Sequence, residues 1–142
     1  MRNAIVAALA LGACFIASTA LAEVIHYTAK LNGASETPPN VTKGVGTAQV
    51  TLDTDSKMLD WKIEYSGLTG AATMAHFHGP AAPGVAAGVT VGLTAPLASP
   101  IVGTANLNDG QIGDLRAGLW YINVHTAQYP KGEIRGQVEA VH

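Results

Sequence analysis

The chain contains little that would cross-link it or charge it strongly. Its 142 residues include one cysteine, Cys14, so no disulfide can form within the chain. A domain of this size without disulfides has to depend on an apolar core, which is feasible at this length. Eight basic residues stand against ten acidic ones, and no basic cluster occurs among them. This pattern excludes the electrostatic footprint of a protein that binds nucleic acid.

Long hydrophobic runs are also absent, with one exception at the N-terminus. Arg2 precedes an almost uncharged apolar run over residues 4–17, and Ala20-Leu21-Ala22 follows as an A-x-A cleavage sequence. The run is short for a membrane span and no stop-transfer pattern follows it, so this order is typical of a secretory signal peptide. We predict that residues 1–22 are removed. Residues 23–142 would then form a single domain in the periplasm or outside the cell, without a membrane span.

A bacterial lipoprotein signal is an alternative interpretation of the same segment. Leu11-Gly12-Ala13-Cys14 resembles a lipoprotein box in which Cys14 would carry the lipid. That assignment leaves a very short hydrophobic region, and Phe15 and Ile16 continue the apolar run instead of beginning a polar tether. We therefore favour cleavage after Ala22 without a lipid, and lipidation at Cys14 stays open.

The rest of the chain has the alternation and the turns of short β-strands. The clearest signal is a hairpin, in which strand 47–53 and strand 59–66 flank the polar turn 53–57. We expect further strands over residues 25–31, 74–78, 89–93, 101–107, 119–125 and 133–141, with the first at a sheet edge. One short helix is predicted over residues 108–117, capped by Asn108 or Asp109 and ended by Gly118.

This pattern predicts an all-β fold, a sandwich or barrel of one domain with one short helix. The alternation also predicts which side chains point inward. The expected core consists of large apolar residues on the strands: Trp61, Ile63, Tyr65, Phe77, Trp120, Ile122, Val124, Ile134 and Val138.

Three histidines form a candidate metal site. His76 and His78 are two residues apart on a predicted strand, so they share one face with Met74. His125 lies at the end of another strand. Imidazole suits copper, zinc, iron and nickel, and copper(II) binds most tightly among them. We predict that the three histidines bind one ion, copper ahead of zinc, with the Met74 thioether as an additional weak ligand.

The alternative is that these histidines are structural. His76 and His78 would then hydrogen-bond carbonyl groups of the loop over residues 79–88, and His125 would bond across its own hairpin. His26 is expected to be an exposed strand residue, and His142 is terminal.

The last hairpin predicts a polar face beside His125. If His125 lies opposite Glu133, then Asn123 pairs with Arg135 and Tyr121 pairs with Gln137. Such a face is expected to point outward from a sandwich. An Arg–Glu pair on it would either fix a histidine tautomer or be solvated surface.

No catalytic group is predicted. Nothing in the sequence brings Glu36 and Glu133 together as a carboxylate pair, and no Ser-His-Asp order, phosphate loop or Cys-His pair stands out. The H-x-H strand also resembles copper–zinc superoxide dismutase. The chain has too few histidines for the two-metal site of that enzyme and lacks its disulfide, so we reject a dismutase.

Several segments together resemble the CHRD domain, first recognised as the repeat of chordin. The resemblance rests on residues 31–39 (LNGASETPP), 75–81 (AHFHGPA), 119–126 (LWYINVHT) and 132–137 (GEIRGQ). It implies a Greek-key, immunoglobulin-like β-sandwich or barrel and assigns no activity, and the growth-factor binding of chordin does not transfer to a lone domain. Two functions are therefore expected. One is extracytoplasmic metal binding in storage, delivery or resistance, and the other is a non-catalytic module that binds a protein partner through the loops over residues 79–100.

Overall fold

The computed structural model describes residues 21–142. Most of the predicted signal peptide, including Cys14, lies outside the described residues. The described part contains nine strands, one turn of 3-10 helix and one α-helix, in the order β1 (Val24–Asn32), η1 (Gly33–Ser35), β2 (Val45–Asp53), β3 (Met58–Ser66), β4 (Ala72–His78), β5 (Val89–Gly92), β6 (Ile101–Asn106), α1 (Asp109–Arg116), β7 (Tyr121–Thr126), β8 (Ile134–Gln137) and β9 (Glu139–Ala140).

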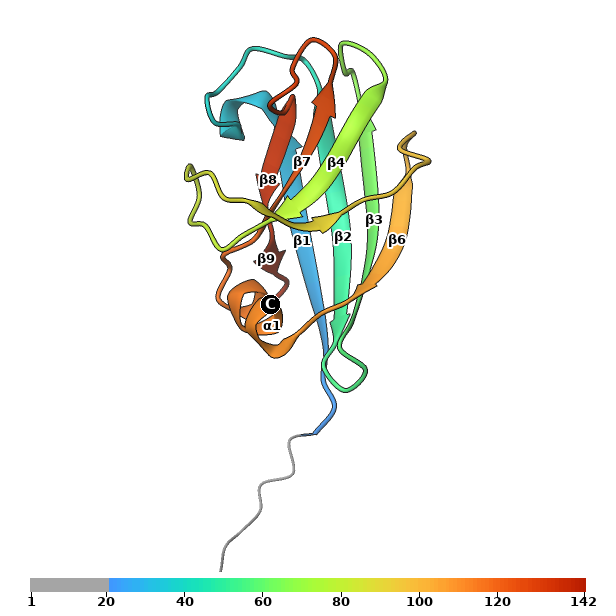
Figure 1. Cartoon of the computed structure of the whole chain (residues 1–142), viewed down its shortest axis with the longest axis vertical. Coiled ribbons are helices and arrows are strands. Elements are labelled where there is room, and N and C mark those ends of the chain that lie inside the picture. The colour runs from blue at the N-terminus through green and yellow to red at the C-terminus, as the bar shows by residue number, and fades with distance from the viewer. Residues whose placement is uncertain (1–20) are drawn as a thin grey trace, which may run out of the picture.

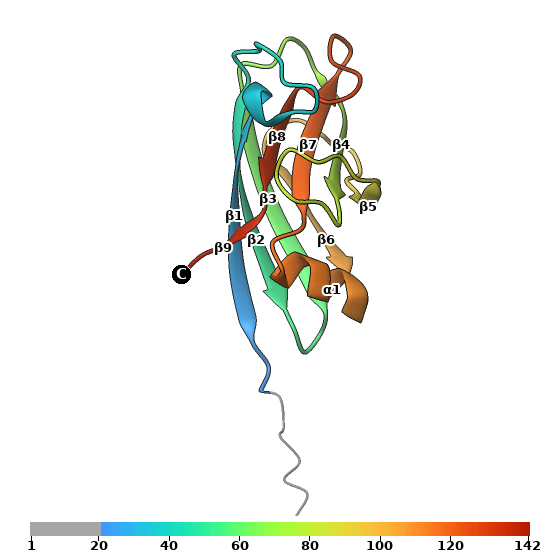
Figure 2. The same ribbon diagram turned by 90° about the vertical axis from the view of Figure 1, so that its left-hand side faces the viewer.

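The strands form two antiparallel layers that share one continuous sheet. Their order is β5-β4-β7-β8-β1-β2-β3-β6, with β9 beside β1. Figures 1 and 2 show β1, β2, β3 and β6 in one layer, β4, β5, β7 and β8 in the other, and α1 at one end. The layers join where Asn32 of β1 pairs with Arg135 of β8. The prediction of an all-β sandwich, nearly closed into a barrel and with one short helix, is confirmed.

The core between the layers contains the residues predicted from alternation. Trp61 of β3 packs edge-on against Phe77 of β4, with ring centroids 5.3 Å apart, and the ring centroid of Trp120 lies 5.8 Å from that of Phe77. Eight of the nine predicted core residues are buried. Tyr65 is partly buried and donates a hydrogen bond from its hydroxyl to the carbonyl of Leu97. Each large apolar side chain buried in this way contributes about 1.5–3 kcal/mol.

The position of the first strand differs from the prediction. β1 is an interior strand, because β2 pairs along its whole length on one side while β8 and β9 pair with it on the other. The two edges of the sheet are β5 and β6. The alternation of β1 identifies its buried face, but a period of two carries no information about how many strands hydrogen-bond to it.

The short helix is built as the sequence indicates. Asn108 caps it in a capping box with Gln111, and Gly118 follows its end with a positive φ of 73°. Leu115 is its one fully buried residue and joins the core cluster. The helix therefore closes one end of the sandwich and leads the chain into β7.

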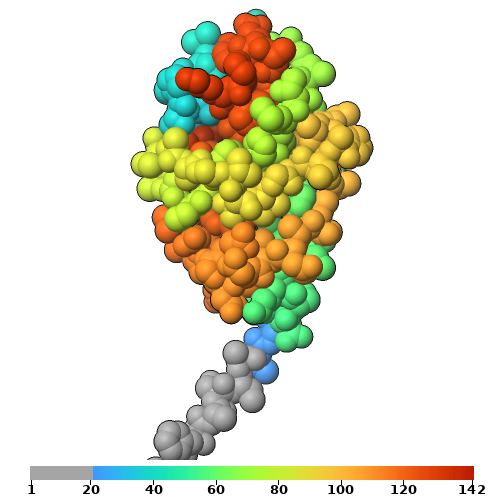
Figure 3. Space-filling model, in the orientation of Figure 1, coloured from blue at the N-terminus to red at the C-terminus, as the bar shows by residue number. Residues whose placement is uncertain are grey.

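The polar face of the last hairpin has the predicted register but not the predicted exposure. Tyr121 pairs with Gln137 and Asn123 pairs with Arg135. All four were expected on an outward face, yet Asn123 is 3% and Arg135 1% exposed. The loops between β1 and β2, between β4 and β5 and between β7 and β8 fold over this face, and Figure 3 shows the segment around β5 as a band across it. A buried polar layer therefore lies on the outer side of β4, β7 and β8.

Candidate metal centre

The pairing of β4 with β7 brings the three predicted histidines together. His76 and His78 project from the last three residues of β4, and His125 projects from β7. Gly79 ends β4 where a Cβ atom would lie 2.6 Å from the ring of Trp120, so glycine is the residue that fits this close approach. β4 ends at His78, and both of its histidines lie beside β7.

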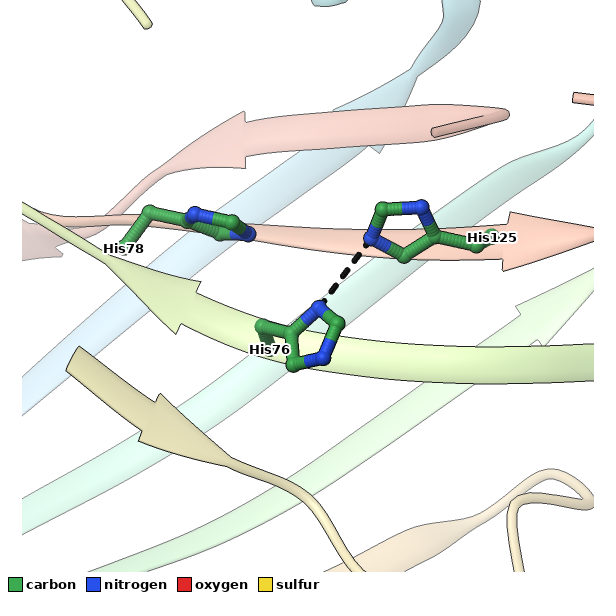
Figure 4. Close-up of side chains that lie close together, drawn as sticks. All are labelled: His76, His78 and His125. Atoms are coloured by element: carbon green, nitrogen blue, oxygen red, sulfur yellow. Dashed lines mark hydrogen bonds between the residues drawn. The ribbon is translucent and has the colours of Figure 1, made fainter. Parts of the chain in front are cut away.

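The three imidazoles converge on a small volume. One ring nitrogen from each histidine lies within 4.8 Å of the others. Nδ1 of His76 and Nε2 of His125 are 3.1 Å apart, as the dashed line in Figure 4 marks. If both bound one ion at about 2.0–2.1 Å, the angle at the ion would be about 100°. The predicted convergence of His76, His78 and His125 is thus present in the fold, at a spacing that one metal ion can bridge.

The tautomer of His125 favours coordination. Its Nδ1 lies 2.9 Å from the carbonyl oxygen of Pro130, which can only accept a hydrogen bond. Nδ1 therefore carries the proton, and the lone pair of Nε2 points into the cluster. A carbonyl that holds the outer ring nitrogen in this way is the usual support for a metal-binding histidine.

His78 is held on both of its ring nitrogens. Nδ1 lies 3.0 Å from the carbonyl oxygen of Ala87, and Nε2 lies 2.8 Å from Oδ1 of Asn123. The ring also stacks on Tyr121, with centroids 4.7 Å apart and planes 3° from parallel. Both partners are oxygen acceptors, and a neutral imidazole carries one N–H, so the ring can donate to only one of them at a time. When the N–H is on Nδ1 and faces the carbonyl of Ala87, the lone pair of Nε2 is free for a metal.

Burial keeps two of the rings in the neutral form that binds metal. The pKa of His76 is lowered first by burial and then by the neighbouring charges of His125 and His78. Burial also lowers the pKa of His125, against the opposing effect of its hydrogen bond to Pro130, and His78 lowers it further. Because metals compete with protons for the same lone pairs, both shifts favour metal binding near neutral pH.

Met74 and His26 take different positions relative to this cluster. Met74 lies on β4 directly opposite His125 of β7 and is 45% exposed. Its role as a weak thioether ligand stays a prediction. His26 lies on β1 in the other layer, exposed and beside the hydroxyl of Thr51. It serves as a natural control residue, since it is remote from the three rings.

Two carboxylates near the polar face are buried, although the sequence pattern predicts Glu133 on an outward face and gives Glu36 no place there. Glu133 is fully buried and accepts hydrogen bonds from the hydroxyls of Thr42, Thr69 and Thr126 and from the Thr69 N–H. Burial alone would raise the pKa of Glu133, but these hydrogen bonds outweigh it and lower the pKa. Glu36 is 4% exposed, and burial is the main reason that its pKa is raised.

The predicted Arg–Glu pair does not form. Arg135 donates to the hydroxyl of Thr37 and to the carbonyl of Val85, and its Cζ lies 3.5 Å from the centroid of the Tyr121 ring. Glu133 is satisfied by threonines instead. Both partners were visible in the sequence, but their contacts come from loops whose path the strand pattern does not specify.

The fold and this cluster define an all-β domain with a candidate three-histidine metal centre. The family model for the CHRD domain matches residues 27–138. The chain therefore belongs to the CHRD domain family, as the sequence motifs predicted. No curated protein and no solved structure matches the chain. Within residues 21–142, no helix is long and apolar enough to cross a membrane.

Proposed function

We propose that this protein binds one copper ion through His76, His78 and His125 and acts outside the cytoplasm in copper storage, delivery or resistance. The observation that carries the proposal is the convergence of three ring nitrogens within 4.8 Å. Within the described residues, they form the one cluster of three or more histidine, cysteine or acidic side chains that can share an ion.

Copper is proposed ahead of zinc because of the donor set. Imidazole accepts either metal, and copper(II) is the more tightly bound of the two at nitrogen and oxygen sites. Within residues 21–142, no cysteine or carboxylate joins the three histidines, so the thiolate ligands typical of a structural zinc site are not part of this cluster. The signal peptide predicted at residues 1–22 would place this function in the periplasm or outside the cell.

A second candidate function is a protein-binding module whose histidines are structural. The observation that favours it is that both ring nitrogens of His78 and both of His125 already have partners within the protein. In that case the histidines would serve to fix the loop between β4 and β5 for contact with a partner. The two functions differ in whether the cluster has measurable affinity for an ion.

Titration of tag-free mature protein with copper(II) and zinc(II) tests the proposal. We expect one equivalent of copper, bound more tightly than zinc. The His76→Ala/His78→Ala double variant should lose this binding, and the His26→Ala variant should keep it. Equal copper binding by the wild type and the double variant would overturn the proposal and favour the protein-binding module.

A further inference from the structure

The amide of Asn123 lies at the edge of the histidine cluster. Asn123 is the cross-strand neighbour of His76, and its Oδ1 is 2.8 Å from Nε2 of His78. Two donor atoms bound to one metal at about 2.0–2.1 Å are about 2.8–3.2 Å apart when the angle between them is near 90–100°. Both the Asn123–His78 distance and the 3.1 Å between His76 and His125 have this length. Two separate donor–donor pairs thus already have the spacing of edges of one coordination polyhedron.

The protein fixes which end of this amide faces the histidines. Asn123 is 3% exposed, and its amide lies against the carboxyl of Glu36, where it counts among the groups that lower the pKa of that carboxyl. Oε1 of Glu36 makes no hydrogen bond of normal geometry, so this contact is a weak one. A carboxylate nevertheless attracts the N–H end of an amide and repels its oxygen, which turns Oδ1 toward His78.

A missing side chain makes room for this arrangement. Gly132 has a φ of 128°, and a Cβ atom at this position would overlap with both the Glu36 carboxyl and Nδ2 of Asn123. Glycine therefore admits the carboxyl and the amide to the same space. The Nδ2 end of the Asn123 amide thus lies beside Glu36 and Gly132, while its Oδ1 end lies beside His78.

We infer that Oδ1 of Asn123 is the fourth donor to the metal, completing a set of three nitrogens and one oxygen. This inference rests on the proposed copper site and deepens it. A metal-bound Nε2 of His78 has no N–H, so Oδ1, 2.8 Å from that nitrogen, has nothing to accept from it and is free to coordinate the same ion. A neutral oxygen beside three imidazoles suits tetragonal copper(II), whereas the Met74 thioether would favour copper(I). Asn123 thus selects the oxidised ion.

Substitutions of Asn123 can distinguish two roles of its Oδ1, as a metal ligand or as a hydrogen-bond acceptor for His78. Loss of either a ligand or a supporting group weakens binding by at least about tenfold, so Asn123→Leu alone does not distinguish them. Asn123→Asp does, when it is made together with Glu36→Gln to avoid two adjacent carboxylates. If Oδ1 is a ligand, the Asp oxygen attracts the dication, and copper(II) affinity should rise by about tenfold or more over Glu36→Gln alone. If Oδ1 only accepts from His78, Asp should hold the Nε2 proton more strongly, and affinity should fall.

A measurement on the wild-type protein removes the dependence on folded variants. Protein labelled with ¹³C at the side-chain carbonyl of asparagine is loaded with one equivalent of copper(II) and studied by pulsed electron–nuclear double resonance. A strong ¹³C coupling is expected, because the Asn123 carbon would be one bond from a ligand atom. Absence of this coupling, or lower or unchanged affinity in the Asp variant, would overturn the inference while leaving the three-histidine site intact. Failure of the wild type to bind copper would overturn the proposed function itself.

Discussion

The two faces of β7 are both buried, yet they hold the protein together in different ways. All six residues of the strand are buried. On the inner face, Ile122 and Val124 pack into the apolar core, where contacts have no direction. On the outer face, the amide of Asn123 is hydrogen-bonded to the ring of His78, and the ring of His125 is hydrogen-bonded to the carbonyl of Pro130. The inner face sets stability, and the outer face sets the positions of donor atoms.

The largest loss of stability is expected on the apolar side. Trp120 and Trp61 are large and buried, so replacing either by alanine leaves a cavity that the neighbouring strands fill only in part. Each variant should lose about 3–5 kcal/mol of unfolding free energy. Denaturant unfolding curves measure this loss. A change below about 1 kcal/mol in both variants would contradict the packing described for the core.

The two buried carboxylates on the polar side should respond in opposite ways. Glu133→Gln replaces an acceptor of four hydrogen bonds by an amide whose NH₂ faces donors, so it should cost about 1–3 kcal/mol. Glu36→Gln removes a charge that burial penalises, so it should change stability by less than about 1 kcal/mol or increase it. Unfolding curves of both variants at neutral pH give the comparison. An equal loss of unfolding free energy in both variants would contradict the idea that the hydrogen bonds accepted by Glu133 stabilise the fold.

The smallest effect expected is the dependence of metal-free stability on pH. His76 and His125 have lowered pKa values in the folded state, so below their ordinary value of 6.5 the unfolded chain binds more protons. Stability should therefore fall as the pH drops from 6.5 through the folded pKa values. Glu133 adds a loss of the same sign below its ordinary value of 4.5.

Glu36 contributes to the pH dependence of stability with the opposite sign. Its pKa is raised in the folded state, so just above pH 4.5 the folded state binds more protons than the unfolded chain. The melting temperature, measured without metal across this range, should decline toward acid. The decline near pH 6 should be weaker in a variant that carries His76→Ala and His125→Ala. A profile with the same slope in the variant and the wild type would contradict the assignment to these histidines.

The sequence specified the inner face and the register of the outer one. Alternation around Trp61 and Trp120 identifies the core, and the spacing of His76 and His78 places both on one face of a strand. The order of residues around the last turn correctly pairs Asn123 with Arg135. Each of these predictions depends on neighbours within a strand or a hairpin, which local periodicity encodes.

Contacts between distant segments could not be predicted in this way. The side chain of Asn40 donates to the carbonyl of Glu133, 93 positions away, and Arg135 reaches the carbonyl of Val85, 50 positions away. These contacts bring loops over the polar face and bury it. The interior position of β1 and the approach of Glu36 to Asn123 depend on the same tertiary arrangement, for which a single strand pattern has no signal.

We propose that three histidines from β4 and β7 hold one ion on the outer, polar face of the sandwich. Anomalous diffraction at the copper absorption edge, on crystals of tag-free protein with one equivalent of copper(II), tests it most directly. We expect one strong peak at about 2.0–2.1 Å from a ring nitrogen of each of His76, His78 and His125. A peak elsewhere on the protein, or none between these rings, would contradict it.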